Sequence, residues 1–453
     1  MSSEKKVISG ATIVNEGLSF VGDVFMNGNI IESIVAYREG LNPDYKNYDV
    51  IHAMGLHLLP GVIDDQVHFR DPGLTYKGDI YTESKAAVAG GITSFMDMPN
   101  TIPNCLTQEL LEEKYQHAAI TSLANYSFYM GASNDNLEEI IKTNPQYVCG
   151  IKVFMGASTG NMLVDSDEAL TGIFSSAPTL VAVHCEDEES IVRNNAYYFE
   201  KYGEQASTDI HPKIRSAEAC FLSSAKAVNL AKKYGTRLHV LHLSTEKEMV
   251  LFENELPLEE KKITAEVCVH HLWFSEEDYN EKGNFIKWNP AIKATSDKNA
   301  LLEAVLNNKI DVVATDHAPH TIEEKKKPYF KAPSGGPMVQ HSLIAMLEFC
   351  HRGKLTLEKV VEKMCHNPAI LFNVDKRGFI RPGYKADLVL VDLNNIWTVK
   401  TENILYKCGW SPMAGEVFRS KVVSTFVNGN RVYNKGVFTE NIKGERLTFN
   451  KKI

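Results

Sequence analysis

The residues best suited to chemistry in this chain lie where short apolar runs end, and the first such run is the most informative. Residues 62–70 read VIDDQVHFR, and Asp71-Pro72-Gly73 then supplies a turn. Residues two apart in a strand share one face. We therefore expect Gln66, His68 and Arg70 to project together from the end of this strand.

Metal-binding side chains also lie at or near the ends of the later apolar runs. Imidazole and carboxylate groups that converge from several strands are typical of a metal site. A single histidine at a strand end is more often structural, and we interpret three of them in that way: His239, His270 and His271. The candidate metal ligands are His68, Lys152, His184, His242 and Asp316.

Lys152 stands out because it lies among Ile151, Val153, Phe154 and Met155. Burying an ammonium group is costly unless it is paired or loses its charge. Two interpretations stay open on these residues alone. Lys152 either pairs with a buried carboxylate, or it is neutral and functional.

The apolar runs alternate with amphipathic stretches between about residue 59 and residue 352. Eight strands, each followed by a helical segment, are typical of a (β/α)8 barrel, an α/β fold whose chemistry lies at the C-terminal ends of the strands. The predicted helices include 81–89, 108–122, 214–234 and 297–307. The predicted strands are 61–70, 92–99, 125–131, 150–155, 180–185, 237–243, 263–270 and 311–315.

The two ends of the chain have a different pattern. Residues 7–35 contain two alternating runs with an Asn-Gly turn, and residues 378–392 and 424–433 are again strand-like with glycine turns. We predict that both ends join in one small β-sandwich domain. The predicted divisions are 1–58 and 371–453 for this domain and 59–370 for the barrel.

These motifs resemble those of the amidohydrolase superfamily, and of dihydroorotases in particular. The first strand resembles the signature Asp-x-His-x-His-x-Arg, except that Gln66 replaces its first histidine. His-Cys-Glu-Asp at 184–187, His-Leu-Ser-Thr at 242–245 and Thr-Asp-His-Ala-Pro-His at 315–320 resemble further dihydroorotase blocks. Residues 378–388 resemble the C-terminal signature Gly-x-Ile-x-x-Gly-x-x-Ala-Asp-Leu.

The resemblance implies a zinc-dependent, reversible cyclisation of N-carbamoyl-L-aspartate to (S)-dihydroorotate in pyrimidine biosynthesis. It implies that the five candidate ligands bind one or two Zn²⁺ ions and that Lys152 is N-carboxylated. It also implies that Asp316 transfers the proton, and that Gln66 is either a metal ligand or a neighbour of the ligands. Water activated by the ions would attack the amide carbonyl. The implied substrate-binding residues are Arg70, Asn100 and His320 for a carboxylate, and Asn289, Gly335 and Gly336 for the ring.

Other functions stay open beside this one. A dihydropyrimidinase, hydantoinase or allantoinase would use the same metals on a different ring, and a non-catalytic homologue could serve as an assembly subunit. The polar segment 320–337 is either a solvated loop or a lid over the site.

Composition narrows the class of protein. The net charge of −9, from 48 basic and 57 acidic residues, does not favour nucleic acid or anionic lipid. Eight scattered cysteines without a Cys-x-x-Cys pair, and no long apolar run, indicate a cytoplasmic enzyme with a small-molecule substrate. We expect a homodimer or higher homo-oligomer, which could associate with another enzyme of the pyrimidine pathway.

Overall fold

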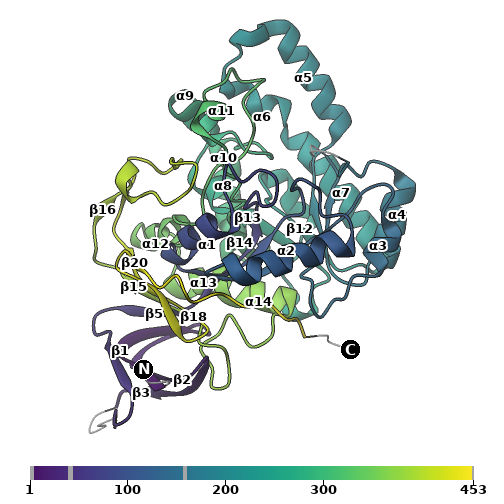
Figure 1. Cartoon of the computed structure of the whole chain (residues 1–453). Helices are drawn as coiled ribbons and strands as arrows, with labels where there is room; N and C mark the ends of the chain where they lie inside the picture. The colour runs from purple at the N-terminus through teal and green to yellow at the C-terminus, as the bar shows by residue number, and fades with distance from the viewer. Residues whose placement is uncertain (1–4, 39–43, 157–160, 451–453) are drawn as a thin grey trace.

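The computed structural model describes residues 5–38, 44–156 and 161–450, and a closed parallel barrel forms its centre (Figure 1). A three-stranded run, β6-β7-β8, and a six-stranded run, β9 to β14, follow each other around the barrel. β8 and β9 are two parts of one predicted strand, and a parallel bridge from Val67 to His317 closes the circle. The predicted (β/α)8 fold is confirmed. The strands are β6 Val62–Val67, β7 Ile92–Asp97, β8 Asn125–Phe128, β9 Met130–Gly131, β10 Ile151–Phe154, β11 Val181–His184, β12 Leu238–Val240, β13 Ile263–Cys268 and β14 Val312–Ala314.

Helices surround the barrel, and side-chain caps fix where several of them begin. Asp79 accepts a hydrogen bond from the Thr82 amide at the start of α1, and Ser216 caps α7 in the same way. Gly235, with φ 72°, ends α7 in the left-handed conformation that glycine adopts at low cost. The helices are α1 Ile80–Ala89, α2 Gln108–Thr121, α3 Leu137–Ile141, α4 Asp167–Ser176, α5 Glu188–Tyr202, α6 His211–Ile214, α7 Ala217–Tyr234, α8 Val269–Trp273, α9 Tyr279–Lys282, α10 Thr295–Leu306, α11 Ile322–Lys325, α12 Ser342–His351, α13 Leu357–Val361 and α14 Asn367–Phe372.

Both ends of the chain contribute to one nine-stranded sheet beside the barrel, in the order β20-β19-β18-β15-β5-β1-β2-β3 with β4 on β1. β5 holds the two ends together, because it pairs with β1 on one side and β15 on the other. The sheet curls around its own apolar core, and Ile30 on β3 bridges to Lys385. The domain divisions themselves stay a prediction. The strands are β1 Lys5–Asn15, β2 Leu18–Asn27, β3 Ile30–Ala36, β4 Asp49–His52, β5 His57–Pro60, β15 Leu388–Asp392, β18 Lys421–Val427, β19 Asn430–Asn434 and β20 Val437–Phe438; β16 Trp397–Thr398 pairs separately with β17 Val417–Phe418.

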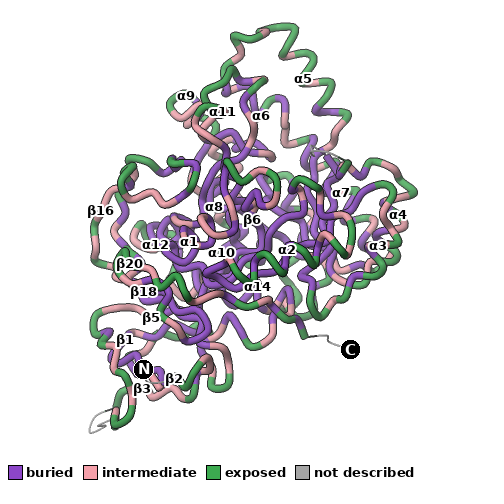
Figure 2. The backbone as a smooth tube through the Cα atoms, in the orientation of Figure 1, coloured by how far each residue is buried: buried purple, intermediate pink, exposed green. Residues whose placement is uncertain are grey.

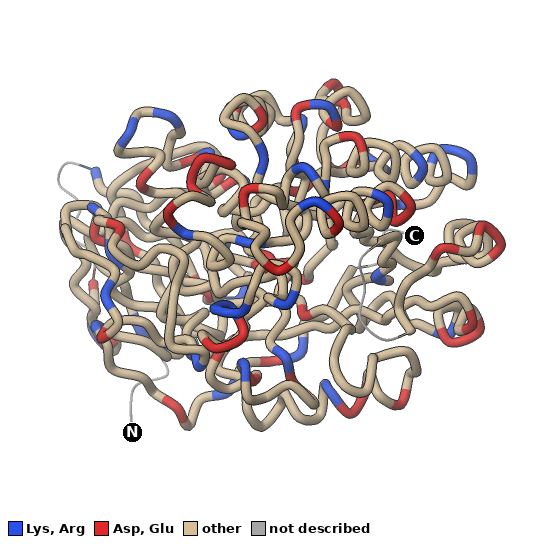
Figure 3. Tube along the Cα trace, turned by 90° about the horizontal axis from the view of Figure 1, so that it is seen from above, with Lys and Arg blue, Asp and Glu red and all other residues tan. Residues whose placement is uncertain are grey.

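The barrel strands and the inner faces of the helices are buried, whereas α5 extends away from the body at the top of the view (Figure 2). Basic and acidic residues are interspersed along the backbone trace in Figure 3. In the part of the chain that the structure describes, no helix has the length and apolar character to cross a bilayer.

Candidate active site

A cavity of about 90 Å³ lies at the C-terminal ends of the barrel strands and brings the predicted metal ligands together. A larger cavity, about 420 Å³, lies near the opposite ends of the strands, beside Leu180 and Arg237, and does not include any candidate ligand. The smaller cavity is therefore the candidate active site. Its lining residues are Gln66, His68, Arg70, Lys152, Phe154, His184, His242, Trp288, Asn289, Asp316, Ala318, Ser334 and Gly335.

His184 and His242 face each other across one side of this cavity. His184 Nδ1 lies 2.9 Å from His242 Nε2, and the rings are nearly perpendicular. The outer nitrogen of His184, Nε2, lies 3.0 Å from Glu186 Oε2, and Glu186 is also paired with Arg215. Burial lowers the pKa of both histidines, so they are neutral, which is the form that binds a metal.

His68 and Asp316 form the opposite side. His68 Nε2 lies 3.1 Å from Asp316 Oδ1, while His68 Nδ1 lies 2.7 Å from Asn100 Oδ1. Gln66 Nε2 donates to the same Asp316 oxygen over 3.3 Å. Gln66 thus occupies the place that strand alternation predicted, and it contacts Asp316 through its amide group.

Lys152 enters the cavity from β10 and is only 1% exposed. Its Nζ lies 4.5 Å from the centre of the Phe154 ring, and within the described residues it forms no hydrogen bond or ion pair. Burial lowers the pKa of Lys152 to about 7, so a large fraction of the amine is uncharged near neutrality. This arrangement favours the neutral, functional interpretation over a buried ion pair.

Three residues of the site have a left-handed backbone. The φ angles are 69° for Arg70, 40° for His242 and 44° for Asp316. Residues other than glycine adopt this conformation at a cost, and such strain collects at functional sites. The fold therefore stabilises these three side-chain positions against local preference.

A second polar network adjoins the cavity around Arg70. Arg70 Nε donates to Pro319 O over 3.1 Å, and Arg70 Nη2 lies 3.1 Å from His320 Nε2. Lys77 Nζ lies 3.0 Å from His320 Nδ1 and 3.0 Å from Glu324. The network has two cationic side chains and one carboxylate, so it retains positive charge for an anionic ligand.

The segment after β14 is anchored to the barrel by buried lysines. Lys325 donates to Pro333 O over 3.0 Å and to Gly335 O over 2.7 Å, and Lys287 Nζ donates to Tyr329 O and Ala332 O. These bonds hold residues 333–335 at the cavity. Position 335 accommodates only glycine, because a Cβ there would lie 2.6 Å from Ala318 O.

The other predicted residues occupy different positions around the cavity. Asn289 and Gly335 line it, whereas Asn100 and His320 lie behind His68 and Arg70. Gly336 packs against Trp288 and Trp410, outside the lining. His239 contacts Asp65 over 3.1 Å beneath the site, and His270 and His271 lie beside Trp288 or Pro290.

Sequence reasoning did not identify Glu186 or Lys77. Glu186 follows His184 by two residues, and that spacing could have indicated that the carboxylate shares the histidine's face. Lys77 lies seven residues beyond Arg70, in the loop before α1, and has no such signal.

The donor set fits divalent cations. Two neutral imidazoles, His68, the carboxylate of Asp316 and the amine of Lys152 converge on one small buried cavity. His242 Nδ1 is buried without a hydrogen-bond partner. Imidazole and oxygen donors are ligands that zinc accepts.

Comparisons with known proteins agree with this geometry. The amidohydrolase family profile matches residues 57–432. A dihydroorotase of Pyrococcus abyssi is 33% identical over 95% of this chain and 98% of its own, and one of Halobacterium salinarum is 31% identical over 91% and 94%. The L-hydantoinase of Arthrobacter aurescens superposes with a TM-score of 0.89 at 27% identity, over 95% of this chain and 96% of the other. The chain therefore belongs to the amidohydrolase family, within its dihydroorotase branch, as the first-strand motif predicted.

Proposed function

We propose that this chain catalyses the reversible cyclisation of N-carbamoyl-L-aspartate to (S)-dihydroorotate, in pyrimidine biosynthesis. The observation that carries the proposal is Arg70, whose guanidinium lines the same cavity as the metal-binding donors. A planar, permanently charged fork suits a carboxylate. The cyclic amide of dihydroorotate carries one, whereas hydantoin and dihydrouracil do not.

We further propose that one or two Zn²⁺ ions are held by His68, His184, His242, Asp316 and a carboxylated Lys152. Bound zinc would polarise the substrate carbonyl and activate water. Lys152 suits carboxylation because its uncharged amine is the form that attacks CO2. His184 is held in orientation by Glu186, which fixes the nitrogen that faces His242.

The chain's own residues account for proton movement and orientation. Asp316 Oδ1 accepts the proton from the attacking water and returns it to the ring nitrogen that leaves, and the reverse reaction uses the same oxygen. Gln66 and His68 hold this carboxylate in place. Arg70 orients the substrate carboxylate, with His320 behind it and Asn289 beside the ring.

Turnover of purified protein with each ring decides among the candidate functions. Ring opening can be followed by the change in absorbance. We expect the protein to open dihydroorotate only when metal is bound, and to open dihydrouracil and hydantoin much more slowly. Equal activity on the uncharged rings would favour the hydantoinase function, for which the L-hydantoinase superposition is the supporting observation. No turnover of any ring by zinc-loaded protein would indicate a non-catalytic assembly subunit.

We also propose a homodimer or larger homo-oligomer, and a cytoplasmic location. The support for assembly is α5, on which Tyr197 is 57% and Phe199 52% exposed. Association with a second enzyme of the pathway would use the same kind of surface. Light scattering of the purified chain, with Tyr197→Ser as the variant, tests whether α5 carries the interface.

A further inference from the structure

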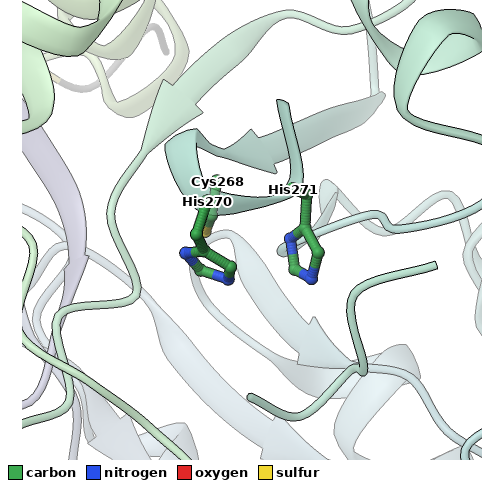
Figure 4. A group of neighbouring side chains, drawn as sticks. All are labelled: Cys268, His270 and His271. Carbon is green, nitrogen blue, oxygen red and sulfur yellow. The ribbon is translucent and has the colours of Figure 1, made fainter. Parts of the chain in front are cut away.

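Cys268, His270 and His271 form a second group of metal-type donors just outside the active-site cavity. Cys268 ends β13, and the two histidines follow in α8. Their donor atoms all lie within 4.8 Å of one another, and the three residues are 0%, 0% and 2% exposed. Figure 4 shows the two imidazole rings side by side, extending in the same direction from the chain.

The two rings leave buried nitrogen atoms without partners. Neither His270 nitrogen has a partner with hydrogen-bonding geometry, and His271 Nδ1 has none either. Leaving such an atom unsatisfied destabilises the folded state, so a ligand that supplies a partner would be favoured here. The His270 ring also stacks on Trp288, with centroids 4.2 Å apart and planes at 12°, and this packing sets the plane of the imidazole.

The state of His271 suits metal binding. Its Nε2 lies 3.1 Å from Pro290 O, and a carbonyl oxygen only accepts, so Nε2 carries the proton. The lone pair is then on Nδ1, which is the atom without a partner. Burial also lowers the pKa of both histidines, which keeps the rings neutral.

The charges around Cys268 favour a cation. Its Sγ lies 3.5 Å from Gln66 Oε1 and 3.5 Å from Glu266 Oε1, and either oxygen can accept the single S–H of the thiol. Burial together with Glu266, Asp316 and Asp64 raises the pKa of this thiol, because the surrounding carboxylates oppose another negative charge. The same negative potential stabilises a divalent cation.

We propose that Cys268, His270 and His271 bind one thiophilic divalent cation, Zn²⁺ by the chemistry of the donors, at a site separate from that of the catalytic ions. Two nitrogens and one sulfur around zinc leave a fourth position, for which Gln66 Oε1, Glu266 Oε1 or water is at hand. Tetrahedral bonding places donors roughly 3.4–3.7 Å apart, so side-chain movements of about 1 Å close the site. The thiol proton leaves to solvent as the metal binds.

Bound metal would hold His270 against Trp288. Trp288 lines the active-site cavity, and its Nε1 donates to Asp316 O over 3.3 Å. The ion would thus stiffen one wall of the cavity without touching substrate.

Cobalt is the probe that separates this site from the active site, because no active-site ligand proposed above is a thiolate. Protein stripped with a chelator is titrated with Co²⁺ alone while near-ultraviolet absorption is recorded. We expect a thiolate-to-cobalt charge-transfer band. Cys268→Ser should lose the band and bind one ion fewer per chain. The control variant Cys350→Ser, at a partly buried cysteine on α12, should keep the band and the full number of bound ions.

Two further measurements keep the proposal open to refutation if Cys268→Ser does not fold. Lys152→Ala should weaken the active-site ions and leave the band in place. In the natural chain saturated with Zn²⁺, X-ray absorption at the zinc edge should show a sulfur neighbour at about 2.3 Å, because no active-site ligand proposed above contains sulfur. Absence of the band at saturating Co²⁺, its survival in Cys268→Ser, or absence of the sulfur neighbour from zinc-saturated protein would overturn the proposal, leaving the orphaned nitrogens to buried water.

Discussion

Replacing Arg70 with alanine tests how the site chooses its substrate. Arg70 is buried, its Nε donates to Pro319 O, and its Nη2 lies 3.1 Å from His320 Nε2. Nη1 and the second N–H of Nη2 remain for a ligand. A charge-assisted hydrogen bond to a buried carboxylate contributes about 1.5–3 kcal/mol. We therefore expect Arg70→Ala to lower kcat/KM for dihydroorotate about 10- to 150-fold, with metal content unchanged.

The comparison that isolates this contribution uses dihydroorotate and its uncharged methyl ester. Loss of the bond to Pro319 O disturbs the loop for both ring compounds, whereas the carboxylate bond exists only for the acid. Arg70→Lys keeps the positive charge but not the planar guanidinium. Its kcat/KM for dihydroorotate should therefore lie between those of the natural chain and of Arg70→Ala. An equal loss of kcat/KM for acid and ester in Arg70→Ala would refute substrate recognition and make Arg70 a structural residue.

Three further predictions concern the metal-binding side chains. Asp316→Asn should reduce turnover by far more than tenfold while circular dichroism stays unchanged; retention of a tenth of the activity, only about 1.4 kcal/mol of barrier, would remove Asp316 from proton transfer. Gln66→His should raise zinc affinity or stoichiometry in a chelator titration, because imidazole is a better ligand than an amide; no change would show that Gln66 is adequate or irrelevant. Zinc reconstitution at fixed dissolved CO2 should gain about tenfold in rate from pH 6 to pH 8, because the Lys152 pKa is lowered to about 7 and only the neutral amine reacts; a rate independent of pH would contradict carboxylation.

The barrel and much of the site could be predicted from sequence because strand alternation fixes which side chains share a face. Gln66, His68 and Arg70 lie around one cavity, as their spacing required. The joining of the two chain ends was also predictable, because the sequence indicated only two strand-like runs at each end, and a two-stranded unit is marginally stable by itself. In the structure, β5 pairs with β1 and with β15.

Contacts that depend on loops and on distant elements could not be predicted in this way. Lys77 reaches His320 from the loop before α1, more than 200 residues away in sequence. The segment 320–337 has the composition of a solvated loop, yet Lys325 is buried and donates to three carbonyl oxygens. A run of lysines has the same composition whether its side chains are solvated or buried, so the sequence alone did not distinguish these two states. Whether the segment moves as a lid stays a prediction.

Gln66 links the two groups of donors, and this gives its departure from the family signature a physical meaning. Its amide nitrogen faces Asp316, and its amide oxygen faces the Cys268 thiol. A histidine here would offer nitrogen to the active site but no oxygen to Cys268. The same substitution should therefore strengthen the ion beside His68 and weaken the one proposed at Cys268, and in Gln66→His the cobalt charge-transfer band reports the second effect independently of turnover.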